Sequence, residues 1–221
     1  EEKAVHQALH DSLTEMPNRA AMIERLKTLR ANGTPHLIAY ADLDGFKEVN
    51  DSYGHQVGDR LLCAVGAGIM RLSGNAAMAS RMGGDEFVVL FEGADARVEA
   101  DKFTGMLLRF LAKPFDIDGR IAYVGASIGV AQSEQQDTDE VEILRRADIA
   151  MYKAKLEGKN RSCVYDVSFD AERADSLAIA GELRGIIRNR SLDVVFQPVI
   201  STRDMRVSGV EALARWPKDS T

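Results

Sequence analysis

Two glycines and two acids stand directly before an apolar run in Arg81-Met82-Gly83-Gly84-Asp85-Glu86-Phe87-Val88-Val89-Leu90-Phe91. Adjacent glycines tolerate positive φ at both central positions of a tight turn, so Gly83 and Gly84 predict a β-hairpin. The turn would present Asp85 and Glu86 in front of a buried strand. The stretch is therefore either a plain surface hairpin with solvated acids or the edge of an acidic site.

A second pair of acids ends the apolar strand that we expect over residues 36–43. Side chains alternate along a strand, so Asp42 and Asp44 face the same way while Leu43 points into the core. Carboxylates at such a strand end suit a hard cation, and Mg²⁺ especially when phosphate oxygens complete its ligand shell. The alternative is an Asp-Gly turn whose acids are merely solvated.

The composition excludes several classes of function. A net charge of −6 over 221 residues argues against a broad nucleic-acid-binding surface. No apolar run reaches the roughly 18 residues of a membrane span, so we expect no membrane contact by this chain. Cys63 and Cys163 lack metal-ligand spacing and favour a reducing, cytoplasmic compartment. Both chain ends resemble cuts from a longer protein, which leaves room for a membrane anchor elsewhere in the parent.

The periodicity of apolar residues predicts an α/β fold in which helices flank a central mixed sheet. Gly129 lies inside one expected strand and predicts a bulge or a close backbone approach. We expect helices over 1–13, about 59–72, 94–113 and 141–157, and a further helix from Thr14 or Glu15 to about Leu29 with Pro17 in its first turn. We expect strands over 36–43, within the 76–91 hairpin and over 121–131. Residues 50–59 are expected to form a polar turn.

Some polar residues have two interpretations each. Lys155 and Lys159 flank the end of the 141–157 helix, where cations either complement the helix dipole or clamp a triphosphate. Asn50 and Asp59 carry the donor and acceptor types that a purine edge requires, but they also suit a turn and a first helical turn. His55 alone gives no ligand signal.

Four stretches occur in one order, and together they closely resemble the GGDEF family of diguanylate cyclases over about residues 4–165. The resemblance implies a fold related to nucleotide cyclases and the polymerase palm. It also implies condensation of two GTP molecules into cyclic di-GMP with release of two pyrophosphates. The stretches are Asp11-x-Leu13-Thr14-x-x-Pro17-Asn18-Arg19, Asp42-Leu43-Asp44-x-Phe46-Lys47-x-x-Asn50-Asp51-x-x-Gly54-His55-x-x-Gly58-Asp59, Gly83-Gly84-Asp85-Glu86-Phe87 and Ala147-Asp148-x-Ala150-Met151-Tyr152-x-Ala154-Lys155-x-x-Gly158-Lys159-Asn160.

The resemblance also implies roles for matching residues, with Mg²⁺ as the metal and Mn²⁺ as its alternative. Each domain would hold one GTP, so catalysis would require a homodimer. The implied metal ligands are Asp42, the Leu43 carbonyl and Asp85. The implied catalytic groups are Lys47 and the pair Asp85 and Glu86, which would deprotonate the 3′-hydroxyl. The nucleotide would be contacted at its guanine by Asn50 and Asp59, with His55 close to the substrate, at its ribose by Phe46, and at its phosphates by Lys47, Lys155 and Lys159, while Gly83 and Gly84 would leave room for it.

The chain departs from the family pattern at two places. Glu15 and Met16 replace the usual Gly-Leu, which we expect to alter only the turn before the first family helix. Gly74 and Ala77 occupy the positions of the Arg-x-x-Asp pair that mediates product inhibition. We therefore expect weak or absent inhibition by cyclic di-GMP through that site.

The C-terminal residues predict a connector helix over 166–190 after a GGDEF domain over 1–165. Residues 191–221 resemble the start of an EAL phosphodiesterase domain, in which Glu211 would bind metal and Gln197 would contact cyclic di-GMP. About 30 residues cannot supply the other metal ligands, so we expect no hydrolysis by this chain. The alternative for this segment is a strand and a short helix that pack on the connector or stay mobile.

A working diguanylate cyclase is thus the leading interpretation. The second is a catalytically silent GTP-binding module that regulates a downstream EAL phosphodiesterase of the parent protein. A dimerising scaffold is the third. The sequence identifies neither the input signal nor the activity that dominates in the parent.

Overall fold

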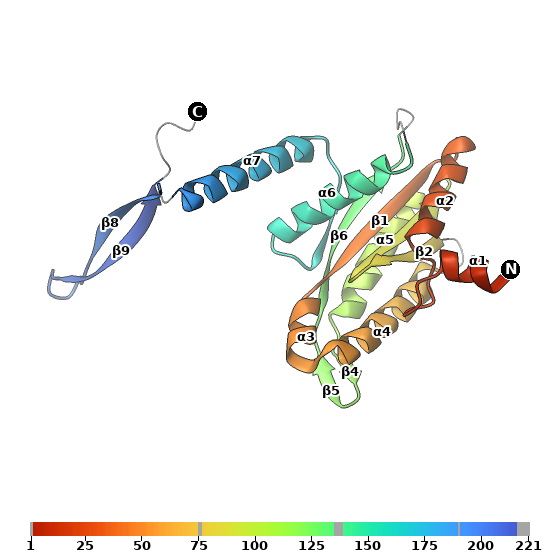
Figure 1. The fold of residues 1–221 in the computed structure, drawn as a ribbon, viewed down its shortest axis with the longest axis horizontal. Coiled ribbons are helices and arrows are strands. Elements are labelled where there is room, and N and C mark those ends of the chain that lie inside the picture. Colours follow the sequence, from red (N-terminus) through yellow and green to blue (C-terminus); the bar gives the residue numbers. More distant parts are fainter. Residues whose placement is uncertain (1, 75–76, 135–138, 190, 216–221) are drawn as a thin grey trace. The chain divides into compact units, whose positions relative to one another are not determined.

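The computed structural model describes residues 2–74, 77–134, 139–189 and 191–215 (Figure 1). The chain divides into two compact units, residues 1–169 and residues 170–221, and each is described by itself. None of the helices in the described ranges combines the length and the apolar character that crossing a membrane requires.

A five-stranded mixed sheet forms the centre of the first unit, in the order β2-β3-β1-β6-β7. Strands β6 and β7 pair in parallel, and the other neighbours are antiparallel. This confirms the predicted mixed sheet flanked by helices. The strands of the unit are β1 (His36–Asp44), β2 (Ala77–Gly83), β3 (Glu86–Glu92), β4 (Phe115–Ile117), β5 (Arg120–Ala122), β6 (Gly125–Gln132) and β7 (Arg161–Val164).

Helices cover both faces of this sheet (Figure 1). Alternate residues of β1 separate two buried clusters: Leu37 and Ala39 pack toward α4 and α5, whereas Ile38 and Tyr40 pack toward α2 and α6. The core is therefore two-layered, and the sheet lies between the layers. The helices are α1 (Glu2–Leu9), α2 (Arg19–Ala31), α3 (Phe46–Tyr53), α4 (His55–Ser73), α5 (Ala96–Leu111), α6 (Glu142–Leu156) and, continuing into the second unit, α7 (Ser168–Arg188).

Gly129 brings α6 unusually close to the sheet, as the sequence predicted. A Cβ atom on Gly129 would lie 1.9 Å from the Ala147 carbonyl oxygen and 2.3 Å from the Met151 nitrogen. Since α6 ends at Leu156, this close approach sets how near its last turn lies to the ends of the strands.

The start of α2 differs from the prediction. The helix begins at Arg19, and the Asn18 side chain caps it by accepting hydrogen bonds from the backbone of Ala20 and Ala21. Pro17 therefore precedes the helix. An amide cap satisfies two free N–H groups, which Thr14 or Glu15 could not do from their positions. Glu15 has φ = 58°, a left-handed conformation that suits the glycine usual in the family.

Two further predictions about local structure are wrong. The polar turn expected over 50–59 is instead the end of helix α3 (Phe46–Tyr53) and the start of α4, which begins at His55. Helix α3 forms because Gly45 precedes it at φ = 87° and Val49 is buried on its inner face. The expected strand over 121–131 is interrupted, and its first residues instead pair with β4 in a separate small hairpin.

The second unit contains most of α7 and an antiparallel hairpin. Strand β8 (Asp193–Ile200) pairs with β9 (Val207–Arg215), so the short helix expected after β8 is wrong. The ladder between the two strands overrides the helix propensity of the Glu211-Ala212-Leu213 run. Gln197 and Glu211 are direct partners across this hairpin.

Candidate active site

The end of β1 and the β2–β3 turn meet at one edge of the sheet. Asp42 lies opposite Glu86 of β3, and the Leu43 N–H donates a hydrogen bond of 3.2 Å to the Asp85 backbone carbonyl. Both glycines of the turn have positive φ, 137° at Gly83 and 53° at Gly84. The structure therefore brings the Gly-Gly-Asp-Glu turn to the strand-end acid Asp42.

Lys155 reaches this edge from the last turn of α6. Its Nζ lies 2.7 Å from Asp42 Oδ2, and the two side chains are 31% and 16% exposed. At this distance the ammonium group makes a charge-assisted hydrogen bond to the carboxylate. The C-terminal turn of α6 thus contributes a cation to the acidic edge instead of only complementing the helix dipole.

Asp85 is the acid whose ionisation this edge disfavours. Burial raises its pKa above the ordinary carboxyl value, and the nearby Asp42 raises the pKa further, while Lys155 opposes the shift. A cation between Asp42 and Asp85 would relieve this repulsion.

The donor set fits a divalent metal that also binds substrate oxygens. It comprises the Asp42 and Asp85 carboxylates and the Leu43 carbonyl. The described part of the chain contains no group of three or more His, Cys, Asp or Glu side chains placed to hold a metal by themselves. Mg²⁺ often binds through one or two carboxylates plus substrate phosphates, so this smaller donor set suits it.

Glu86 faces the α2–α6 side of the sheet and accepts a hydrogen bond of 2.9 Å from the Tyr40 hydroxyl. Burial and this hydrogen bond raise the pKa of Tyr40, which keeps the phenol protonated as a donor. The Glu86 carboxylate is therefore oriented by a buried residue that the sequence analysis did not single out.

Arg81 is a second functional residue that sequence reasoning missed. Its Nε and Nη2 donate to the Gly84 carbonyl at 3.0 and 2.7 Å, and its Nη1 lies 2.7 Å from Asp11 Oδ1. The Arg81 side chain is only 10% exposed. Arg81 thus ties the Gly-Gly turn to the Asp11–Thr14 turn, a contact between segments that are far apart in the sequence.

Asp44 is held in place by hydrogen bonds from two other segments of the chain. Its carboxylate accepts hydrogen bonds of 3.0 Å from the Ser127 hydroxyl and of 2.9 Å from the Asn160 N–H. The second bond anchors the loop after α6 beside the strand end. Lys159, which is exposed at φ = 60°, is carried on this anchored loop.

The expected guanine and ribose contacts lie on α3 and α4. Phe46 and Asn50 are half-buried on α3, whereas Asp59 is exposed on the second turn of α4 and not on its first. Lys47 is exposed at the start of α3. Phe46 and Lys47 follow β1 within three residues, so they lie close to the strand end that carries Asp42.

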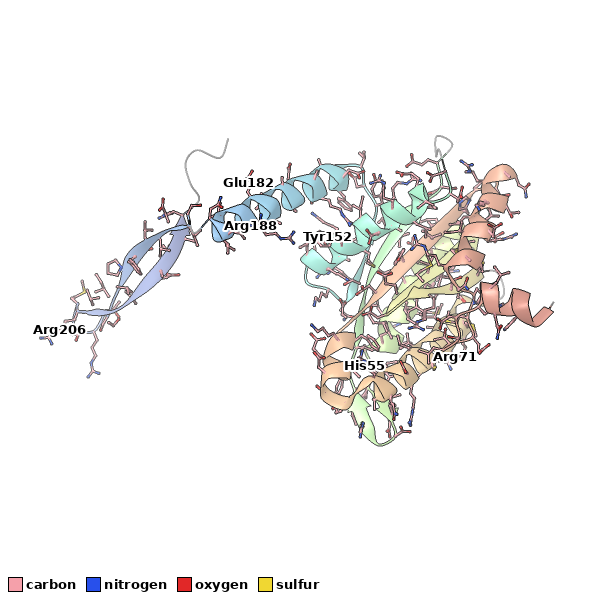
Figure 2. All side chains as sticks on the ribbon, in the orientation of Figure 1. His55, Arg71, Tyr152, Glu182, Arg188 and Arg206 are labelled. Carbon is pink, nitrogen blue, oxygen red and sulfur yellow. The ribbon has the colours of Figure 1, made fainter. Side chains whose placement is uncertain are left out.

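His55 begins α4 at its corner with α3, as Figure 2 shows. It lines a cavity of about 430 Å³ together with Arg60 and Arg120. Its expected closeness to a substrate stays a prediction.

The two positions of the inhibitory pair lie at the start of the hairpin. Gly74 ends α4 with φ = 66° and is exposed. Ala77 begins β2, and residues 75 and 76 between them lie outside the described ranges.

Comparison with known proteins identifies a family for most of the first unit. The profile described as "Diguanylate cyclase, GGDEF domain" matches residues 8–161. The bifunctional diguanylate cyclase/cyclic di-GMP phosphodiesterase MucR of Pseudomonas aeruginosa is 36% identical over 216 residues, which cover 95% of this chain and 31% of MucR. The cyclic di-GMP phosphodiesterase PdeR of Escherichia coli is 35% identical, over 93% of this chain and 31% of PdeR.

A solved structure agrees with this match. The coiled coil and GGDEF domain of DgcB from Caulobacter crescentus, in complex with c-di-GMP, superposes with a TM-score of 0.68 at 28% identity, over 74% of this chain and 88% of that chain. The chain spans about a third of the length of the curated relatives named above.

Proposed function

The chain belongs to the GGDEF family of diguanylate cyclase domains, and from this premise we propose that it condenses two GTP molecules into cyclic di-GMP and two pyrophosphates. The observation that carries the proposal is the meeting of Asp42, Asp85 and Lys155 at one sheet edge. Phosphoryl-group chemistry needs two things there: carboxylates for a metal and a cation for phosphate oxygens.

Diguanylate cyclases of this family use divalent metal ions. Here Asp42, Asp85 and the Leu43 carbonyl would hold Mg²⁺, with Mn²⁺ as the alternative. When bound, the metal would polarise the α-phosphate and lower the pKa of the attacking 3′-hydroxyl. Asp85, together with Glu86, would accept the proton of that hydroxyl.

The remaining residues position GTP. Lys155, which pairs with Asp42 here, would also contact phosphate, and Lys47 and Lys159 would add charge from the exposed rim. Asn50 and Asp59 would read the guanine edge, with His55 near the substrate. Phe46 would pack beside the ribose. Gly83 and Gly84 would let the turn approach the nucleotide.

Each domain would bind one GTP, so the proposal includes a homodimer in which two such edges face one another. Holding two reactants in this geometry makes the condensation effectively unimolecular. Binding of cyclic di-GMP by the DgcB GGDEF structure supports the product assignment. We also propose that the domain acts in the cytoplasm, without nucleic acid or membrane contact of its own.

A second candidate function is a catalytically silent GTP-binding module. It is supported by the PdeR relative, which is named as a phosphodiesterase, and by the short span of this chain within longer relatives. In this proposal residues 191–221 begin an EAL domain of the parent, in which Glu211 would bind metal and Gln197 would contact cyclic di-GMP; the two residues pair across β8 and β9.

One experiment separates the two functions. The chain is incubated with GTP and Mg²⁺, and cyclic di-GMP is measured by chromatography, with Asp85→Ala as the control. A cyclase yields product that the variant does not. Tight GTP binding with no product at high protein concentration would favour the silent module.

A further inference from the structure

Gly58 of α4 lies directly against the side chains of Asn50 and Phe46 from α3. A Cβ atom on Gly58 would lie 2.0 Å from Asn50 Oδ1, 3.0 Å from Asn50 Cγ and 3.3 Å from Phe46 Cζ. The first distance is far inside any van der Waals contact, so these side chains occupy the space that a larger residue would need.

The backbone at this position does not require glycine. Gly58 is the fourth residue of α4 and closes its first turn, and its φ is outside the left-handed region, unlike that of Gly54 just before the helix. Glycine weakens a helix interior relative to alanine. A residue with a Cβ at this position would therefore have to displace the Asn50 side chain.

The Asn50 amide depends on this space for its orientation. Its Oδ1 atom is buried and accepts no hydrogen bond from any residue that the structure describes. Most buried polar atoms are held by hydrogen bonds. Since none holds this oxygen, the packing against Gly58 is what sets the direction of the amide.

We infer that Gly58 is a positioning residue for base recognition, which acts by seating the Asn50 amide and the Phe46 ring. This inference rests on the proposed function for its ligand, a guanine nucleotide. The glycine provides a notch in α4 that lets a half-buried amide approach the base at a fixed angle. A methyl group in the notch displaces the amide while leaving the acidic edge of Asp42 and Asp85 in place.

The test compares Gly58→Ala with Gly105→Ala, a second helix glycine whose Cβ would meet only Arg109 at an ordinary 3.5 Å. Calorimetry measures binding of a non-hydrolysable GTP analogue and of inorganic triphosphate. Gly58→Ala is expected to lower the affinity for the GTP analogue roughly threefold to tenfold, which corresponds to one lost hydrogen bond. Its affinity for inorganic triphosphate is expected to stay unchanged. Equal loss for both ligands, or equal behaviour of the two variants, contradicts the inference.

A double-mutant cycle with Asn50→Ala tests whether Gly58 acts through Asn50. In the Asn50→Ala background, Gly58→Ala is expected to cause no further loss of nucleotide affinity. If Gly58→Ala alone does not fold, recovery of folding in the double variant supports the shared space, and its failure to fold contradicts it.

The side-chain amide resonance of Asn50 gives a readout that needs no nucleotide. It should shift in Gly58→Ala and not in Gly105→Ala, and an unshifted resonance overturns the inference. If the wild-type chain binds no GTP while this resonance shifts, the proposed function fails and the seating of Asn50 by Gly58 stands.

Discussion

The ammonium nitrogen of Lys155 lies 2.7 Å from a carboxylate oxygen of Asp42, although 113 residues separate them in the chain. The close approach of α6 to Gly129 of β6 makes this possible, because it holds the last turn of α6 beside the strand ends. The pair joins a cation to the acid that the site needs for a metal.

Removal of this cation is expected to weaken nucleotide binding. Lys155→Met should lower GTP affinity about tenfold or more, because a charge-assisted contact to phosphate is lost. Lys153→Met is the matched control, since Lys153 lies on the same helix with its Nζ 5.3 Å from the Phe169 ring centroid. Equal GTP affinities of the two variants, measured by calorimetry, would contradict the role of Lys155.

Loss of the Arg81 bridge is expected to reduce both stability and activity. Arg81→Ala leaves the Gly84 carbonyl and Asp11 without their partner, which should lower the free energy of unfolding by roughly 2–4 kcal/mol. Arg81→Lys should retain the charge but lose the fork of hydrogen bonds.

The stability loss in Arg81→Ala should depend on pH. Burial works against ionisation of Asp11, but hydrogen bonds from Arg81 and Thr14 outweigh it and lower the Asp11 pKa. The stabilisation is therefore present above the ordinary carboxyl pKa and is lost as pH falls through the folded value. Denaturant unfolding at several pH values checks this, and a loss of equal size in strong acid would contradict it.

Asp85 is expected to lower the stability of the folded, metal-free protein at neutral pH. Burial and Asp42 raise its folded pKa, so its contribution to stability is present below the ordinary carboxyl pKa and is lost as pH rises through the folded value. Without metal, Asp85→Asn should therefore raise the melting temperature at neutral pH but not in acid. The exposed Asp51→Asn is the control. A lower melting temperature of Asp85→Asn at neutral pH would disprove this account.

Product inhibition is expected to be weak. Neither Gly74 nor the alanine at position 77 can pair with a guanine edge or a phosphate as Arg and Asp do. Initial rates should stay constant as cyclic di-GMP is added. Non-competitive inhibition by low-micromolar concentrations of cyclic di-GMP, lost when residues 74–77 are mutated, would contradict this prediction.

Local spacing in the sequence predicted the parts of the fold that depend on neighbouring residues. The Gly83-Gly84 turn, the β1 strand and the close approach at Gly129 all follow from short patterns, and the structure contains them. Helix α3 was missed because its polar run carries a single fully buried apolar residue, Val49.

Contacts between distant segments could not be predicted in this way. Arg81 and Asp11 are 70 residues apart, and no local pattern indicates that they meet. The notch at Gly58 likewise appears only when α3 and α4 pack. The alternative interpretation of the C-terminal segment placed a short helix after β8, whereas Val207–Arg215 is a strand. Its pairing with β8 is a tertiary contact that local propensity does not indicate.

The most direct test of the proposed active site is a Mg²⁺ titration of cyclic di-GMP formation from GTP, with wild-type protein, Asp42→Asn and Asp85→Asn. We expect saturable, metal-dependent product formation by the wild type and a loss of at least about a hundredfold in both variants. Product formation by either variant at the wild-type rate and with the wild-type Mg²⁺ dependence would contradict the assignment of these two carboxylates to the reaction.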